Sequence, residues 1–126
     1  MKSDFTGWLL DREERRQLLQ EFRPAYADVI ADHVTLESPS AAVRPSPPDV
    51  DGRIVGVVDD HKGVQALVVE IDGTTHRPDG GTFHITWSID RKKGRKPVHS
   101  NDALAHLGWN ALPAPRRIRL LPKASH

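Results

Sequence analysis

Short apolar runs separated by polar, turn-forming segments dominate the hydrophobic pattern of this chain. Six of these runs have the length and the apolar, often β-branched content that is typical of strands. They are residues 7–10, the second half of 28–37, 53–60, 64–72, 82–90 and 116–122. Residues 59–63, Asp-Asp-His-Lys-Gly, span the end of the third run and the gap before the fourth. They have turn composition, so we expect these two strands to form a hairpin.

A helix is predicted over residues 10–22, where apolar residues recur at helical spacing. Asp11 is a candidate N-cap, and Glu14, three residues later, completes the pattern of a capping box. Arg23 and Pro24 then end the pattern, because proline cannot continue a helix and restricts the residue before it.

A second, shorter helix is predicted near the C-terminus, capped by Ser100 or Asn101 and stopped by Gly108. Residues 38–52 hold four of the ten prolines and are expected to form a loop. The element order is then β-α-β-β-β-β-α-β with mostly short connections. This order predicts one α+β domain over the whole chain, with a curved, mainly antiparallel sheet and two helices.

Composition bounds the possible functions. A chain of 126 residues, 37% of them hydrophobic, is long enough to bury one core. The absence of cysteine excludes disulfides, thiolate zinc sites and cysteine nucleophiles. No apolar run approaches the ~20 residues of a membrane span, and the first apolar patch is too short for a signal peptide, so we expect a cytoplasmic protein without membrane contact. The net charge of +1 gives no overall field that would favour nucleic acid.

Two tetrapeptides share one pattern, His-apolar-Thr-apolar, and their histidines lie 51 residues apart. They are His33-Val-Thr35-Leu and His84-Ile-Thr86-Trp. Because side chains on a strand alternate between faces, each histidine shares a face with the threonine two residues later, opposite the apolar residues. If the two strands lie side by side, two imidazoles and two hydroxyls line one groove.

Such a groove suits phosphoester chemistry. One imidazole can take a proton from the attacking oxygen while the other gives a proton to the leaving oxygen, since both titrate near neutral pH. Two threonine hydroxyls can hold the non-bridging phosphate oxygens as charge moves onto them. The scheme predicts His33, Thr35, His84 and Thr86 as the catalytic residues, and it requires no metal or cofactor.

The paired His-x-Thr motifs resemble the 2H phosphoesterase superfamily, which includes RNA ligase-like cyclic phosphodiesterases and domains associated with RNA repair. The resemblance implies a bilobal α+β fold whose two motifs face each other across a cleft. It also implies metal-independent hydrolysis or transesterification of 2′,3′-cyclic or 2′–5′ phosphoester bonds in RNA or a nucleotide. Two features depart from the family pattern: the motifs are closer in sequence than expected, and Asp32 precedes His33 where the family has an apolar residue.

Substrate contacts are predicted outside the motifs as well. The basic segment Arg91–Lys96 follows the second motif's strand, so Arg95 and Lys96 are candidates for binding phosphate. His99 precedes the second helix, where an anion could bind. Tyr26 and Trp109 could stack on a base, although aromatic residues more often serve packing.

Two alternatives from other functional classes remain open. A single His-x-Thr on a strand is more often structural than functional, since threonine is a common strand residue. The chain could therefore be a module that binds the phosphate of RNA or a nucleotide without cleaving it. Alternatively, His33, His84 and Asp32 could hold zinc, which would make the protein a metal-dependent hydrolase, although the sequence has no established metal-binding motif.

Overall fold

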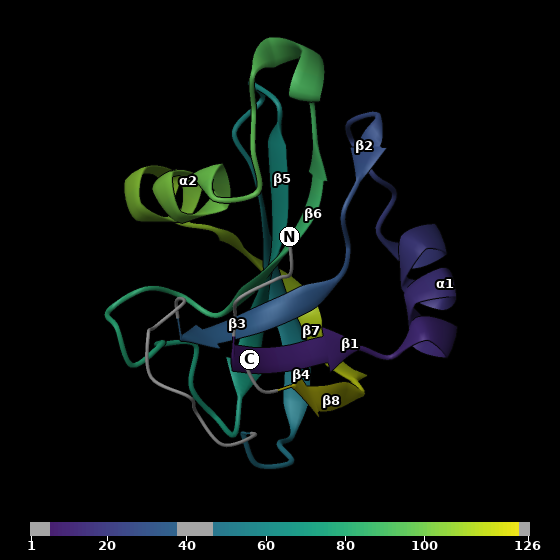
Figure 1. Ribbon diagram of the computed structural model, residues 1–126, viewed down its shortest axis with the longest axis vertical. Helices are drawn as coiled ribbons and strands as arrows, with labels where there is room; N and C mark the ends of the chain where they lie inside the picture. The colour runs from purple at the N-terminus through teal and green to yellow at the C-terminus, as the bar shows by residue number, and fades with distance from the viewer. Residues whose placement is uncertain (1–5, 38–46, 124–126) are drawn as a thin grey trace.

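The computed structural model describes residues 6–37 and 47–123, which form two sheets, two α-helices and one short 3₁₀ helix (Figure 1). In chain order the elements are β1 (Thr6–Leu10), α1 (Arg12–Glu21), β2 (Asp28–Val29), β3 (His33–Glu37), β4 (Gly52–Asp59), β5 (Val64–Ile71), β6 (His84–Ile89), the 3₁₀ helix η1 (Arg91–Lys93), α2 (His99–Leu107), β7 (Asn110–Ile118) and β8 (Leu120–Lys123). The predicted α+β class is confirmed. None of the helices in the described part is long and apolar enough to cross a membrane.

The strands form two sheets where the sequence predicted one. A three-stranded sheet has the order β3-β1-β8, and a five-stranded sheet has the order β2-β6-β5-β4-β7. All of these pairings are antiparallel, and the predicted hairpin of β4 and β5 is confirmed. Two sequence segments, each predicted to contain one strand, contribute strands to both sheets. These segments are 28–37, divided into β2 and β3, and the C-terminal run, divided into β7 and β8.

The segment 28–37 changes sheets at Ala31. Before this point the amides of Ile30 and Ala31 donate to carbonyl oxygens of β6 at 2.9 Å, which extends the pairing of β2 with β6. Ala31 has a φ of +44°, which is uncommon for a residue with a side chain and turns the backbone away. The carbonyl oxygen of Asp32 then accepts the amide of Leu10, and β3 continues along β1.

The main core lies between the two sheets. In Figure 1, β1 and β3 run across the long strands of the five-stranded sheet. Alternate residues of both sheets point into this layer, as their period of two requires. The buried apolar residues in it include Trp8, Leu10, Val34, Ile54, Leu67, Val69, Ile85, Trp87 and Leu120, with Leu18 contributed by α1.

The N-terminal half of the capping box on α1 is confirmed. The Asp11 carboxylate accepts the amide of Glu14 at 3.0 Å. The Glu14 carboxylate, however, accepts the amide of Arg119 at the junction of β7 and β8, while the Asp11 amide donates to the Arg119 carbonyl. The start of α1 is thereby joined to the end of the chain, which no local pattern could have indicated.

Helix α2 covers the other face of the five-stranded sheet, where Ala103 and Leu104 pack on β4 and β5. The predicted caps at its start are wrong, because the N-cap is Val98, without a side-chain bond, and Ser100 is buried inside the first turn. The predicted stop at Gly108 is confirmed, with a φ of +69° that favours glycine. The five-stranded sheet thus lies between α2 and the three-stranded sheet.

Candidate active site

His84 is the first residue of β6 and lies on the face of the sheet that α2 covers. Only 8% of it is exposed. Its Nδ1 donates a hydrogen bond to the carbonyl oxygen of Thr82 at 2.8 Å, and because that oxygen can only accept, the neutral ring carries its lone pair on Nε2. Burial lowers the pKa of His84, as do the nearby charges of Arg77 and His33.

His33 is the first residue of β3, immediately after the chain has left β6. Its Nδ1 lies 3.0 Å from Oδ2 of Asp32, so this ring is also oriented through Nδ1 and its neutral form has the lone pair on Nε2. Burial lowers the pKa of His33, while the adjacent Asp32 carboxylate opposes that shift.

The two histidines belong to different sheets but lie near one another. The pairing of β2 with β6 sets Asp28 opposite Ile89 and Val29 opposite Ser88, and the chain turns away from β6 at Ala31, two residues before His33. Strands β3 and β6 are in contact although they are not paired. Burial lowers the pKa of His84, and the charges of Arg77 and then of His33 add to that shift.

Asp32, the residue that departs from the family pattern, orients His33. Its second carboxylate oxygen accepts the Arg12 guanidinium at 2.6 Å, which forms a chain from Arg12 through Asp32 to His33. Partial burial alone would raise the pKa of Asp32, but the hydrogen bonds from Arg12 and His33 outweigh burial and lower it. The carboxylate therefore stays ionised at neutral pH and holds the imidazole in one tautomer.

The two threonines of the motifs have different surroundings. Thr35 lies opposite Gly7 in the β1–β3 pairing, two residues beyond His33 on the same strand. The buried Thr86 hydroxyl donates to the carbonyl oxygen of Pro97 at 3.2 Å and contacts the Ser100 hydroxyl at 2.9 Å. The hydroxyl of Thr86 thus links β6 to the start of α2, and its proton is not directed toward His84.

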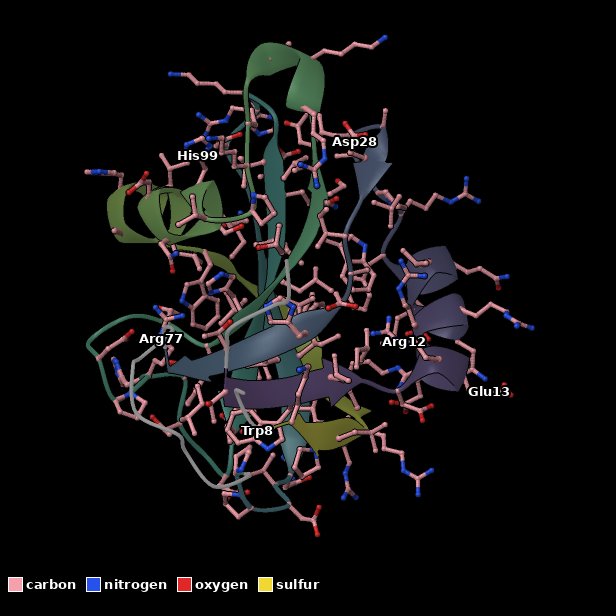
Figure 2. All side chains as sticks on the ribbon, in the orientation of Figure 1. Trp8, Arg12, Glu13, Asp28, Arg77 and His99 are labelled. Atoms are coloured by element: carbon pink, nitrogen blue, oxygen red, sulfur yellow. The ribbon has the colours of Figure 1, made fainter. Side chains whose placement is uncertain are left out.

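Arg77 is a cation near His84 that the sequence did not suggest. Its side chain is only 10% exposed and is held by Asp79, 2.8 Å from Nε, and more loosely by Asn101 of α2, 3.4 Å from Nη2. Figure 2 shows Arg77 on the side of the molecule where α2 lies. A Cβ added at Gly81 would lie 2.8 Å from Nη2 of this guanidinium. The Arg77 guanidinium therefore occupies the space that a side chain at position 81 would need.

Arg95 and Tyr26, predicted to bind substrate, lie at the other end of β6 from His84. The β5–β6 pairing runs from Val68 opposite His84 to Val64 opposite Ile89, a length of about 16 Å. Beyond that end, Arg95 binds Asp60 at 2.7 Å. The structure therefore does not bring Arg95 together with the two histidines.

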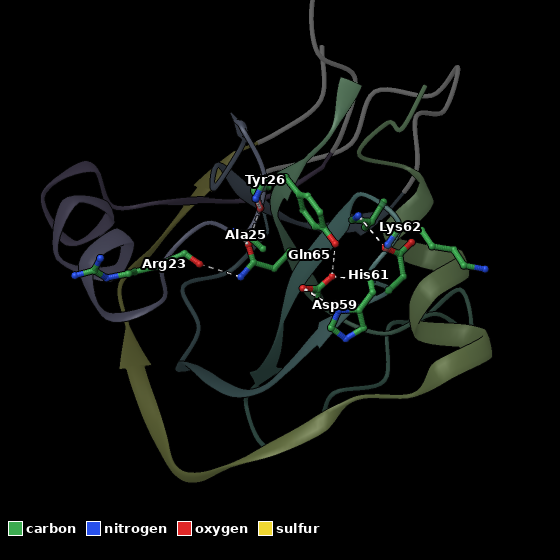
Figure 3. A network of polar contacts seen from close by, with 10 residues as sticks. Arg23, Ala25, Tyr26, Asp59, His61, Lys62 and Gln65 are labelled. Carbon is green, nitrogen blue, oxygen red and sulfur yellow. Dashed lines mark hydrogen bonds and ion pairs between the residues drawn. The ribbon is translucent and has the colours of Figure 1, made fainter. Parts of the chain in front are cut away.

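Tyr26 belongs to a polar network around the β4–β5 turn (Figure 3). Its hydroxyl donates to Asp59 at 2.5 Å, and its amide donates to Ser88. Burial and the hydrogen bond to Asp59 raise the pKa of Tyr26 to about 12. The hydroxyl and the amide of Tyr26 therefore help to hold this turn, at the other end of β6 from His84.

Lys96 and His99 lie on the segment that returns from η1 toward α2. The amide of Lys96 donates to Nδ1 of His99 at 3.0 Å, and this bond fixes the ring at the first residue of the helix. Pro97, between them, accepts the Thr86 hydroxyl, so the segment passes beside β6. The Lys96 side chain is exposed and the His99 side chain is half-buried.

The arrangement does not resemble a metal centre. Within residues 6–37 and 47–123, no three His, Asp or Glu side chains gather in a way that could hold a metal ion. Of the three proposed zinc ligands, Asp32 has its two oxygens engaged by Arg12 and by His33 itself.

No family model, no curated protein and no solved structure matches this chain. The resemblance to the 2H superfamily consequently depends on the two His-x-Thr motifs and on the surroundings of their histidines.

Proposed function

We propose that the protein is a metal-independent phosphoesterase that acts on a cyclic phosphate or a 2′-linked phosphodiester of RNA or a nucleotide, with His33 and His84 as the proton-transfer pair. The observation that carries the proposal is the matched orientation of the two rings. Each Nδ1 is bound to an oxygen acceptor, so the neutral form of each ring carries its lone pair on Nε2, the same nitrogen in both.

The charges around the pair support an anionic substrate. Arg12 and Lys123 lie close enough to lower the pKa of His33, and Arg77 does the same for His84. A phosphate bound between the rings would be attracted by these cations, and Arg77 is nearly buried, where charge interactions are stronger than in water. In this proposal Arg77 takes the phosphate-binding role that the sequence gave to Arg95.

The chemistry divides between the two histidines. The neutral imidazole accepts the proton of the attacking water or hydroxyl, and the protonated one donates to the leaving oxygen. Asp32 stabilises the charged form of His33. Thr35 lies on the strand of the first motif as a hydroxyl donor for phosphate, whereas Thr86 fixes the strand of the second motif against α2.

The test is turnover of 2′,3′-cyclic nucleotides in excess chelator. We expect hydrolysis by the unsubstituted protein, its loss in His33→Ala and His84→Asn, and its retention in His61→Ala, which removes an exposed histidine from the far turn. His84→Asn keeps a donor for the Thr82 carbonyl, so a loss of activity there is not a loss of folding. Hydrolysis that survives either substitution would refute the proposal.

A non-catalytic phosphate-binding module is the second candidate, and the Thr86 hydroxyl favours it. In the motif a hydroxyl two residues after histidine should serve the phosphate, yet this one is engaged with Pro97 and Ser100. Binding of cyclic nucleotide without turnover in the unsubstituted protein would select this function.

A further inference from the structure

A half-exposed indole lies on the same face of the five-stranded sheet as His84. Gly56 of β4 pairs with Val68 of β5, and Val68 pairs with His84 of β6. Directly paired residues point to the same side of an antiparallel sheet, so these three positions form one row across it. The indole of Trp109 occupies the side-chain space of Gly56 at the end of that row.

The indole of Trp109 packs against the backbone of Gly56, where a side chain would otherwise lie. A Cβ at Gly56 would lie 2.1 Å from Cε3 and 2.6 Å from Cζ3 of Trp109, so any other residue there would displace the indole. Trp109 directly follows Gly108, which ends α2, and it remains 37% exposed although it is one of the largest apolar side chains. Its position is fixed by the backbone, and part of its surface is available to a ligand.

The row sets the distance from the indole to the candidate active site. Gly56 and His84 are separated by two inter-strand spacings, or about 10 Å. The imidazole and the indole both extend from the sheet on this side, with the buried Val68 between their strand positions, and one nucleotide is long enough to span about 10 Å. Arg77, on the same side, supplies a positive charge near the His84 end.

We propose that Trp109 is a stacking platform for the base of a nucleotide whose phosphate lies at His33 and His84, so that the substrate carries a base and is not a simple phosphoester. This rests on the proposed function for the position of the phosphate. Aromatic side chains bind bases through their π-faces with little regard to sequence, so the platform would accept more than one base.

Fluorescence tests the location of the base. The chain has three tryptophans, and Trp8 and Trp87 are 2% and 0% exposed, so a ligand that stacks on tryptophan can quench only Trp109. We expect 2′,3′-cyclic AMP to quench the emission of the unsubstituted protein, inorganic phosphate to leave it unchanged, and the quenching to vanish in Trp109→Phe. Quenching that persists in Trp109→Phe, or no quenching by the nucleotide, would overturn the proposal.

Calorimetry of 2′,3′-cyclic AMP binding to a catalytically silent His84→Asn background tests the contribution of the ring. Trp109→Ala should weaken binding by about 5- to 150-fold, since stacking contributes ~1–3 kcal/mol per base. Trp109→Phe, which keeps an aromatic face, should recover most of the affinity. Gly56→Ala, which displaces the indole without removing it, should weaken binding as Trp109→Ala does.

These experiments separate the platform from the chemistry. If the protein does not hydrolyse the nucleotide but Trp109 variants lose affinity, the platform stands and the catalytic proposal fails. If hydrolysis is normal and Trp109→Ala binds as tightly as the unsubstituted protein, the platform is wrong while the catalytic proposal stands.

Discussion

Arg15 holds the backbone at the point where the chain changes sheets, and its removal is the sharpest test of how His33 is positioned. Its Nε donates to the carbonyl oxygen of Ala31 at 2.8 Å, and its Nη2 donates to that of Ile30 at 3.3 Å. Ala31 is the residue with a φ of +44°, so these bonds stabilise a turn that the backbone alone disfavours. We predict that Arg15→Met destabilises the protein and lowers turnover together.

The expected magnitude follows from the two bonds. Hydrogen bonds that involve a charged group contribute about 1.5–3 kcal/mol each when they are buried. Arg15 is only partly buried and one of its bonds is long, so water replaces much of the interaction and a total loss of about 1–2 kcal/mol is expected. For a domain of this size that lowers Tm by about 4–8 °C.

Arg16→Met is the matched control, because Arg16 is the next residue on the same helix and is exposed. Urea unfolding of the two variants gives the difference in free energy, and the rate of cyclic-nucleotide hydrolysis under native conditions gives the effect on the site. If Arg15→Met is no less stable than Arg16→Met, then Arg15 does not hold the crossing. If it is less stable but the folded variant turns over normally, the crossing does not position His33.

Three further predictions concern the pair and its support. Asp32→Asn should lower the pKa of His33 and slow hydrolysis at least tenfold, with the limb of the kcat/KM profile that His33 governs moved to lower pH. Burial lowers the pKa of His84, so near pH 6.5 and below the unfolded chain binds more protons at this residue than the folded chain does. Stability should therefore fall as pH drops from 7 to 5, and urea unfolding should show a smaller fall in His84→Asn. Trp8→Phe removes the bond from Nε1 to the Pro48 carbonyl and should cost about 1–2 kcal/mol at equal denaturant slope.

The strands and their buried faces could be predicted from sequence because the alternation of apolar residues is a local property. In β6, Ile85 and Trp87 point into the core between the sheets, whereas His84 and Thr86 point to the other face, as alternation requires. The hairpin and the Asp11 cap were predictable for the same reason, since the residues that determine them are neighbours in sequence.

The division into two sheets was not predictable, because it depends on partners far along the chain. Nothing in residues 28–37 marks Ala31 as the point where pairing with β6 gives way to pairing with β1. Ser100 is a second residue whose role depends on a partner far along the chain. It has the composition of a helix cap, but its hydroxyl is bound to Thr86 on a neighbouring strand.

Arg95 and Lys96 were predicted to bind substrate because they follow the strand of the second motif in sequence. A residue that follows a strand lies at its far end, a strand length away from the residue that begins it. Arg95 follows β6 in sequence, yet β6 runs away from His84 for its whole length before the basic turn begins. Arg77 precedes β6 and is brought back to His84 by a loop whose shape depends on Gly81 and on Asn101 of α2. Of these two arginines, Arg77 is therefore the one near His84, although its sequence context is that of an ordinary turn residue.

The coupling of the two imidazoles is the central claim, and an NMR titration of the histidine side chains measures it most directly. Because the charge of His33 lowers the pKa of His84, replacing His33 with Gln should raise the pKa of His84, while His61→Gln, far from the pair, should leave it unchanged. An unchanged His84 titration in His33→Gln would mean that the rings do not share a site, and the phosphoesterase proposal would fall with it.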